Sequence, residues 1–85
     1  MKRYIRAAVV DVSDEDDTLK LSIAEDPNTR PSTLKTLAND KHWSIRSAVA
    51  ENPNTPTDVL QTLTNDPDLD VRTAATTSMY SRGAI

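Results

Sequence analysis

Acidic and basic residues recur in this sequence at a fixed spacing of six positions. Asp40 precedes Arg46, and Asp66 precedes Arg72. Such arginines can satisfy turn carbonyls and aspartates within the fold, which is a structural role. The same arginines could instead form a row that binds an acidic partner. The sequence leaves both interpretations open.

A second charged feature lies near the start of the chain. Lys2, Arg3 and Arg6 make the first ten residues basic, and the segment DVSDEDD at 11–17 is acidic. Carboxylates ahead of a helix are favoured by the helix macrodipole, and the same group could contact a basic partner. A calcium loop is disfavoured, because the segment lacks the glycine and the closing glutamate of an EF-hand. The acidic candidates for partner binding are Asp14, Glu15, Asp16 and Asp17.

The single histidine and the single tryptophan are adjacent, at His42 and Trp43. A lone histidine beside a helix start is typical of a solvated residue or a cap. Trp43 has two interpretations: its ring packs over the neighbouring turn, or it anchors a partner, because tryptophan is enriched among the residues that dominate binding energy. Trp43, Arg46 and Arg72 therefore join the candidate partner-binding residues.

No set of residues in the sequence predicts catalysis. The chain has one histidine, no cysteine and a single glycine, Gly83. A nucleophile with its base, a glycine-rich phosphate loop and a thiolate metal site are therefore not indicated. We expect a protein that is not an enzyme and that uses no metal and no cofactor.

The length and charge of the chain further restrict the kinds of protein it can be. A chain of 85 residues is expected to form one domain. Its formal net charge is −3, and without a broad basic stripe it is a poor candidate for binding nucleic-acid phosphates. The apolar run YIRAAVV at 4–10 is too short and too interrupted for a secretory signal or a membrane span. Together with the absence of cysteine, this predicts a cytoplasmic protein.

The elements that position these residues come from an internal repeat. Residues 24–49 align with residues 50–75 without gaps, and twelve of the 26 positions are identical. Such a period is typical of repeat architectures. Each unit is interpreted as two short helices, because apolar residues recur at helical spacing between Asn-Asp and Asn-Pro stops. Residues 16–25 align with the second helix of the next unit and predict an incomplete earlier unit.

The start of the second unit gives the most detailed helix prediction. Thr55 is expected to cap the first helix, with Pro56 in the first helical position and Asp58 in the capping-box position. The second helix is expected to run from about Leu69 to Thr77. The residues expected to be most buried are Leu34, Leu37, Ile45, Val49, Leu60, Leu63 and Val71.

The predicted fold is all-α: a short α-solenoid of two and a half stacked two-helix repeats of 26 residues. Each helix carries one narrow apolar stripe, so only stacking buries a continuous core. Within one domain, 1–85, we expect an N-terminal segment at 1–15, a partial repeat at 16–27, repeats at 28–53 and 54–78, and a tail at 79–85. The N-terminal YIRAAVV is similar to SIRSAVA in the repeat, which favours a helix, but its β-branched residues favour a strand.

The repeated segment resembles a known family. The frame NPNTP…VL..L..D…..VR.A., within residues 17–78, is similar to the tandem leucine-rich repeat variants, superhelical relatives of the HEAT-type solenoids. The resemblance implies a superhelical stack of short helices. The six-residue spacing of Asp40 to Arg46 and of Asp66 to Arg72 also resembles that of HEAT-type repeats, which implies a ladder linking inter-helix turns to the next repeat. The founding member of that family carries a cysteine-bound iron–sulfur cluster on an added N-terminal segment. Because this chain has no cysteine, that activity does not carry over.

Two functional classes follow from these observations. The first is a non-enzymatic protein-interaction module that binds a protein of unknown identity and can also form a homodimer. The apolar residues expected to lie uncovered at the two ends of the stack, and to mediate this self-association, are Tyr4, Ile5, Val9, Met79 and Tyr80. The second class is a small acidic inhibitor or nucleic-acid mimic, of bacterial or phage origin, that occupies a basic groove on its target.

Overall fold

The computed structural model describes residues 17–85. Within them it contains five α-helices and no β-strand, which confirms the predicted all-α fold. The helices are α1 (Asp17–Glu25), α2 (Pro31–Leu37), α3 (Trp43–Glu51), α4 (Thr57–Leu63) and α5 (Leu69–Ser81). The N-terminal segment at 1–15, and with it the choice between helix and strand, lies outside the described residues.

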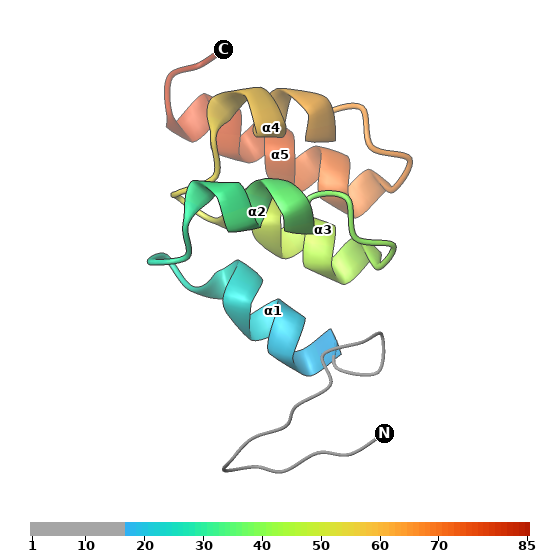
Figure 1. Ribbon diagram of the computed structural model, residues 1–85. Helices are drawn as coiled ribbons and strands as arrows, with labels where there is room; N and C mark the ends of the chain where they lie inside the picture. Colours follow the sequence, from blue (N-terminus) through green and yellow to red (C-terminus); the bar gives the residue numbers. More distant parts are fainter. Residues whose placement is uncertain (1–16) are drawn as a thin grey trace, which may run out of the picture.

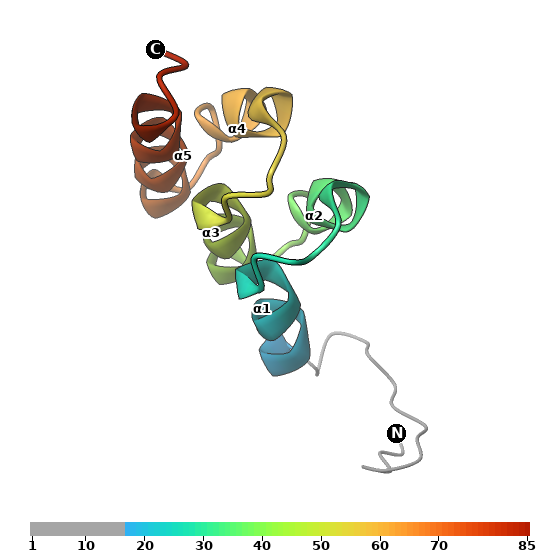
Figure 2. The same ribbon diagram turned by 90° about the vertical axis from the view of Figure 1, so that its left-hand side faces the viewer.

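The five helices form two layers (Figures 1 and 2). α1, α3 and α5 pack side by side in one row, termed here the helix row, and α2 and α4 lie against one side of it. Each two-helix unit therefore adds one helix to each layer, as expected of a short helical solenoid. Among the described helices, none is both long enough and apolar enough to cross a membrane.

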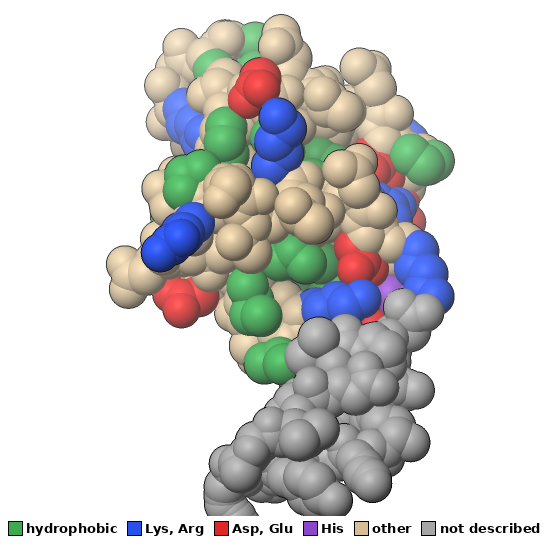
Figure 3. All heavy atoms as spheres, viewed as in Figure 1, with side chains coloured by type: hydrophobic (Ala, Val, Ile, Leu, Met, Phe, Trp, Pro, Cys, Tyr) green, Lys and Arg blue, Asp and Glu red, His purple; other side chains and the backbone are tan. Residues whose placement is uncertain are grey.

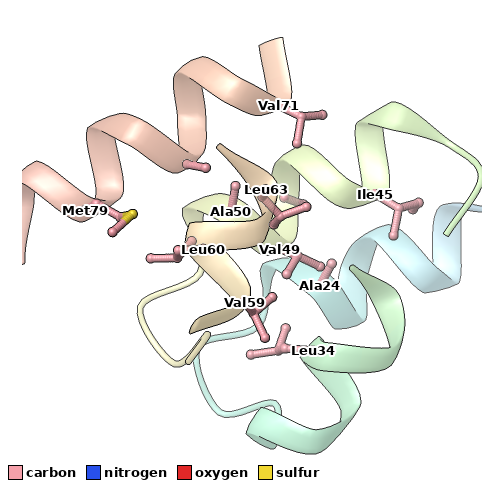
Figure 4. Packing of buried hydrophobic residues seen from close by; sticks show 12 residues of the cluster. Ala24, Leu34, Ile45, Val49, Ala50, Val59, Leu60, Leu63, Val71 and Met79 are labelled. Atoms are coloured by element: carbon pink, nitrogen blue, oxygen red, sulfur yellow. The ribbon is translucent and has the colours of Figure 1, made fainter. Parts of the chain in front are cut away.

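The core lies where the two layers meet (Figure 4). Of the seven residues expected there, six are at most 3% exposed: Leu34, Ile45, Val49, Leu60, Leu63 and Val71. The expectation for Leu37 is wrong, because this side chain is only partly buried. Its helix, α2, packs less extensively against α3 than α4 packs against α5. Small side chains, at Ala24 and Ala50, are fully buried within the helix row.

The repeated Pro-Asn-Thr sequence forms the turn that joins one unit to the next. The hydroxyl of Thr55 donates to the carbonyl of Val49 over 2.7 Å, and Thr29 donates in the same way to Ile23 over 2.6 Å. Each bond adds to a carbonyl near the end of the preceding helix, which also accepts a backbone N–H, from Asn52 at Val49 and from Asp26 at Ile23. The threonine of the repeat thus closes the previous helix.

The expected capping of α4 by Thr55 is wrong. Thr55 is only 1% exposed and its hydroxyl is already committed to the preceding helix. Pro56 takes the N-cap position without a side-chain hydrogen bond, and Asp58 makes no capping box. In α5, by contrast, the carboxylate of Asp68 accepts the backbone N–H of Asp70 at 2.8 Å and so caps the helix.

α5 extends beyond its expected end at Thr77 and runs to Ser81. The added turn contacts the preceding unit: Ser78 Oγ donates to the carbonyl of Ala50 over 2.6 Å. Just after the helix, Arg82 donates to carbonyls in the turn at 52–55. These long-range hydrogen bonds stabilise the extra turn. They could not be predicted from the apolar periodicity of the sequence.

Candidate functional site

A ladder of charged side chains links the units of the stack. Nε of Arg46, on α3, lies 2.8 Å from Oδ2 of Asp66, and Nη2 lies 3.1 Å from Oδ1. Its Nη1 donates to the carbonyl of Asp40 over 2.8 Å. This two-point contact is the strong form of an arginine–carboxylate pair. The interpretation of Arg46 as a ladder residue that satisfies a turn carbonyl and an aspartate is confirmed.

Lys20 forms the equivalent ion pair of the ladder one repeat earlier, and this role of Lys20 was not predicted from the sequence. Its Nζ, on α1, lies 3.0 Å from Oδ2 of Asp40. Lys20, Arg46 and Arg72 follow one another at intervals of 26 residues, which is the period of the repeat. That spacing could have identified Lys20 as the equivalent of Arg46 and Arg72. The predicted ladder included only arginines as its basic residues.

Arg72 is the last member of this series. Its Nη1 donates to the carbonyls of Asp66 and Pro67, over 2.8 and 3.1 Å. No carboxylate among residues 17–85 forms an ion pair with it. Arg72 therefore makes the turn-carbonyl contacts that Arg46 makes, without the carboxylate contact.

The two aspartates of the ladder are held in their charged form. Burial acts to raise the pKa of Asp40, but hydrogen bonds from the His42 backbone and from Lys20 lower it to about 2. Burial also opposes ionisation of Asp66, and the Arg46 guanidinium lowers the pKa of that carboxyl below its usual range. The same hydrogen bond to Asp66 raises the pKa of Arg46. Because the Asp40 and Asp66 side chains are 9% and 6% exposed, they stabilise the stack and offer little to a partner.

His42 lies between two carboxylates at the turn from α2 to α3. Its Nδ1 is 3.1 Å from Oδ1 of Asp40, and its Nε2 is 3.0 Å from Oδ2 of Asp17. Figure 3 shows cationic, acidic and histidine side chains gathered at one edge of the displayed face. His42 occupies the N-cap position of α3 but makes no side-chain cap. In the described part of the chain, no group of His, Cys, Asp and Glu residues is placed to hold a metal ion.

The other predicted site residues are scattered. Asp14, Glu15 and Asp16 lie outside the described residues, as do Tyr4, Ile5 and Val9. Of the acidic candidates, Asp17 begins α1 and its side chain is 41% exposed. The expectation that Met79 is uncovered is wrong, since the extension of α5 places it in the core at 4% exposure. Its neighbour Tyr80 is 66% exposed.

Trp43 lies in a groove between two helices of the helix row, termed here the α3–α5 groove. Trp43, Ser47 and Glu51 follow one another at four-residue spacing, so they share one side of α3. The groove has a volume of about 420 Å³. The full lining consists of Trp43, Ser47 and Glu51 on α3 and of Asp70, Thr73, Ala74, Thr77 and Ser78 on α5.

Among the residues that the structure describes, Trp43 is the only large apolar side chain in the lining of this groove, and it is 50% exposed. The helical spacing could have placed Glu51 on the same side of α3. Asp70 could not have been assigned to the groove, because only the packing of α5 against α3 brings it there. The sequence therefore identified the aromatic residue of the groove but not its acidic residues.

A comparison with known families covers most of the described chain. The family model described as the Leucine Rich Repeat Variant domain matches residues 18–78. This span contains the ladder from Lys20 to Arg72 and the whole lining of the α3–α5 groove. No curated protein and no solved structure gave a significant match.

Proposed function

The chain belongs to the leucine-rich repeat variant family, and we propose that it is a protein-interaction module that binds its partner in the α3–α5 groove. The half-exposed ring of Trp43 is the observation that carries this proposal. Exposed tryptophan beside a groove is suited to anchoring a partner, because a large ring buries much area while ordering few torsions. The indole N–H can in addition donate a hydrogen bond to the bound segment.

The framework around Trp43 supports binding by a preformed surface. The residue begins α3, which is packed between α1 and α5 in the helix row. Three residues further along, Arg46 holds α3 to the turn before α5. The two walls of the groove are thus fixed relative to each other, so little ordering remains to oppose association.

The alternative of an acidic inhibitor or nucleic-acid mimic has no comparable support. The acidic residues on which it was based, Asp14, Glu15 and Asp16, lie outside the described residues, and Asp40 and Asp66 are nearly buried and paired within the stack. A non-catalytic role in the cytoplasm is part of our proposal. It is supported by the repeat family and by a sequence without cysteine.

The test is quantitative affinity capture from a lysate of the source organism, with the wild-type chain, Trp43→Ala and Leu69→Ala. Leu69 follows Trp43 by one repeat, begins α5 as Trp43 begins α3, and is 64% exposed. It is therefore a matched control for the loss of exposed apolar area. Thermal melts must first show that both variants unfold at the same temperature as the wild type.

We expect at least one protein whose recovery falls roughly tenfold or more with Trp43→Ala, as for an interface hot spot. Its recovery with Leu69→Ala should stay near that of the wild type. Equal recovery of every captured protein by all three chains would contradict the proposal.

A further inference from the structure

The charged side chains that line the α3–α5 groove all have one sign. Glu51 and Asp70 are both exposed, and none of the lysines and arginines among residues 17–85 lines the groove. Within residues 17–85 neither carboxylate forms an ion pair. They differ in this from Asp40 and Asp66, whose charges are compensated inside the ladder.

The carboxylates lie toward the two ends of the groove. Asp70 is in the first turn of α5, beside the start of α3 where Trp43 stands. Glu51 is eight residues along α3 from Trp43, which corresponds to about 12 Å of helix. A cation at the Trp43 end would therefore meet an aromatic ring and the Asp70 carboxylate in the same groove.

We propose that the α3–α5 groove binds a cationic side chain, arginine or lysine, of a partner protein segment. This inference rests on the proposed function and adds the chemistry of the partner. The negative face of an indole ring attracts a cation, and the Asp70 carboxylate adds a charge of the complementary sign. Arginine suits the groove better than lysine, because its planar group can stack on the ring while donating to the carboxylate.

The remaining lining residues fit the rest of such a segment. Ser47, Thr73 and Thr77 carry hydroxyls that can donate to or accept from the backbone of a peptide lying in the groove. Their short side chains leave the space open. A segment that was entirely apolar would leave these hydroxyls and both carboxylates without partners, which costs binding energy. The groove thus selects against such a segment.

Trp43 fluorescence gives a direct test, because this is the only tryptophan in the chain. The full chain is titrated with a hexa-arginine peptide, a hexa-citrulline peptide of the same shape without charge, and a hexa-glutamate peptide. We expect a saturable change in emission with hexa-arginine and none with the other two. Raising the salt concentration should weaken the binding of hexa-arginine, because exposed charges are screened.

Two matched variants locate the charge that matters. Asp70→Asn and Asp58→Asn each remove one exposed carboxylate from the first turn of a helix, but only Asp70 lines the groove. We expect the dissociation constant for hexa-arginine to rise about fivefold with Asp70→Asn and less than twofold with Asp58→Asn.

Equal binding of hexa-citrulline, equal effects of the two variants, or no saturable change with hexa-arginine would overturn the inference. None of these outcomes alters the dependence of protein capture on Trp43, which tests the proposed function separately. If capture depends on Trp43 while hexa-arginine does not bind, the module binds a partner of different chemistry. If hexa-arginine binds while no captured protein depends on Trp43, the proposed function itself fails.

Discussion

The guanidinium of Arg46 contacts both carboxylate oxygens of Asp66, at 2.8 and 3.1 Å, across the boundary between two repeats. Arg46 belongs to α3, whereas Asp66 lies in the turn that precedes α5. The contact therefore stabilises the stacking of units and not the fold of either unit alone. The recurrence of aspartate and arginine with a 26-residue period is explained by this geometry.

The ladder predicts an order of stabilities among arginine variants. Arg46→Ala leaves the nearly buried Asp66 without its cationic partner and should lower the free energy of unfolding by about 2–3 kcal/mol. Arg72→Ala removes only bonds to turn carbonyls and should cost about 1 kcal/mol. Urea denaturation followed by circular dichroism measures both.

Arg30→Ala and Lys35→Ala are the controls for this order. Both side chains are exposed, so each change should stay within about 0.5 kcal/mol. An equal decrease in the free energy of unfolding for all four variants would mean that the ladder is not structural. It would then favour a binding role for Arg72.

Acid should weaken the stack through Asp40. The folded state lowers the pKa of this carboxyl to about 2, below the value of about 3.9 in an unfolded chain. Its contribution is therefore complete above about pH 4 and disappears as the pH falls through about 2, for a loss of roughly 2 kcal/mol. Asp66, whose pKa is also lowered, acts in the same direction.

Unfolding free energies measured between pH 5 and pH 2 check this. Asp40→Asn should be less stable than the wild type at neutral pH and should lose less stability on acidification. Asp58→Asn, which changes an exposed carboxylate on α4, should keep the wild-type dependence. An unchanged acid dependence in Asp40→Asn would contradict the assignment.

Equivalent leucines of the two repeats should differ in their importance. Leu63 is 3% exposed, and Leu63→Ala should cost about 2–5 kcal/mol. Leu37, one repeat earlier, is only partly buried, so Leu37→Ala should cost about 1–2 kcal/mol because less apolar contact is lost. Thermal melts of both variants test this, and equal losses would contradict the observed difference in packing.

Local patterns predicted much of this fold. Apolar residues at helical spacing, together with the Asn-Asp and Asn-Pro stops, indicated five short helices and six of the buried core residues. These features depend on neighbours a few positions apart, and the 26-residue period then fixed their stacking. The charged ladder was predictable for the same reason, since its aspartates and its arginines each recur at that period.

The features that the sequence did not predict depend on contacts that helical periodicity does not describe. Thr55 was expected to cap the next helix, but its hydroxyl reaches back to Val49 and closes the previous one. Ser78 and Arg82 extend α5 by contacts with the preceding unit. The presence of Trp43 and Asp70 in the lining of one groove likewise requires α5 to pack on α3, and no periodicity in the sequence encodes it.

Self-association stays a prediction. Of the residues expected to mediate it, Met79 is buried and Tyr80 is 66% exposed on α5. Light scattering across a wide range of concentrations should show the mass rising from one chain to two. Deletion of residues 1–10 should prevent this rise. A single-chain mass at the highest concentration, with a melting curve unaffected by the deletion, would contradict it.

The most direct test of binding in the α3–α5 groove is an NMR titration of the labelled full chain with hexa-arginine. We expect the largest shifts at the Trp43 indole N–H and at the amides of Ser47, Thr73 and Thr77, which line the two walls. The amides of α2 and α4, on the opposite side of the helix row, should change little. Shifts concentrated on α2 and α4, with the Trp43 indole resonance unchanged, would contradict binding in the α3–α5 groove.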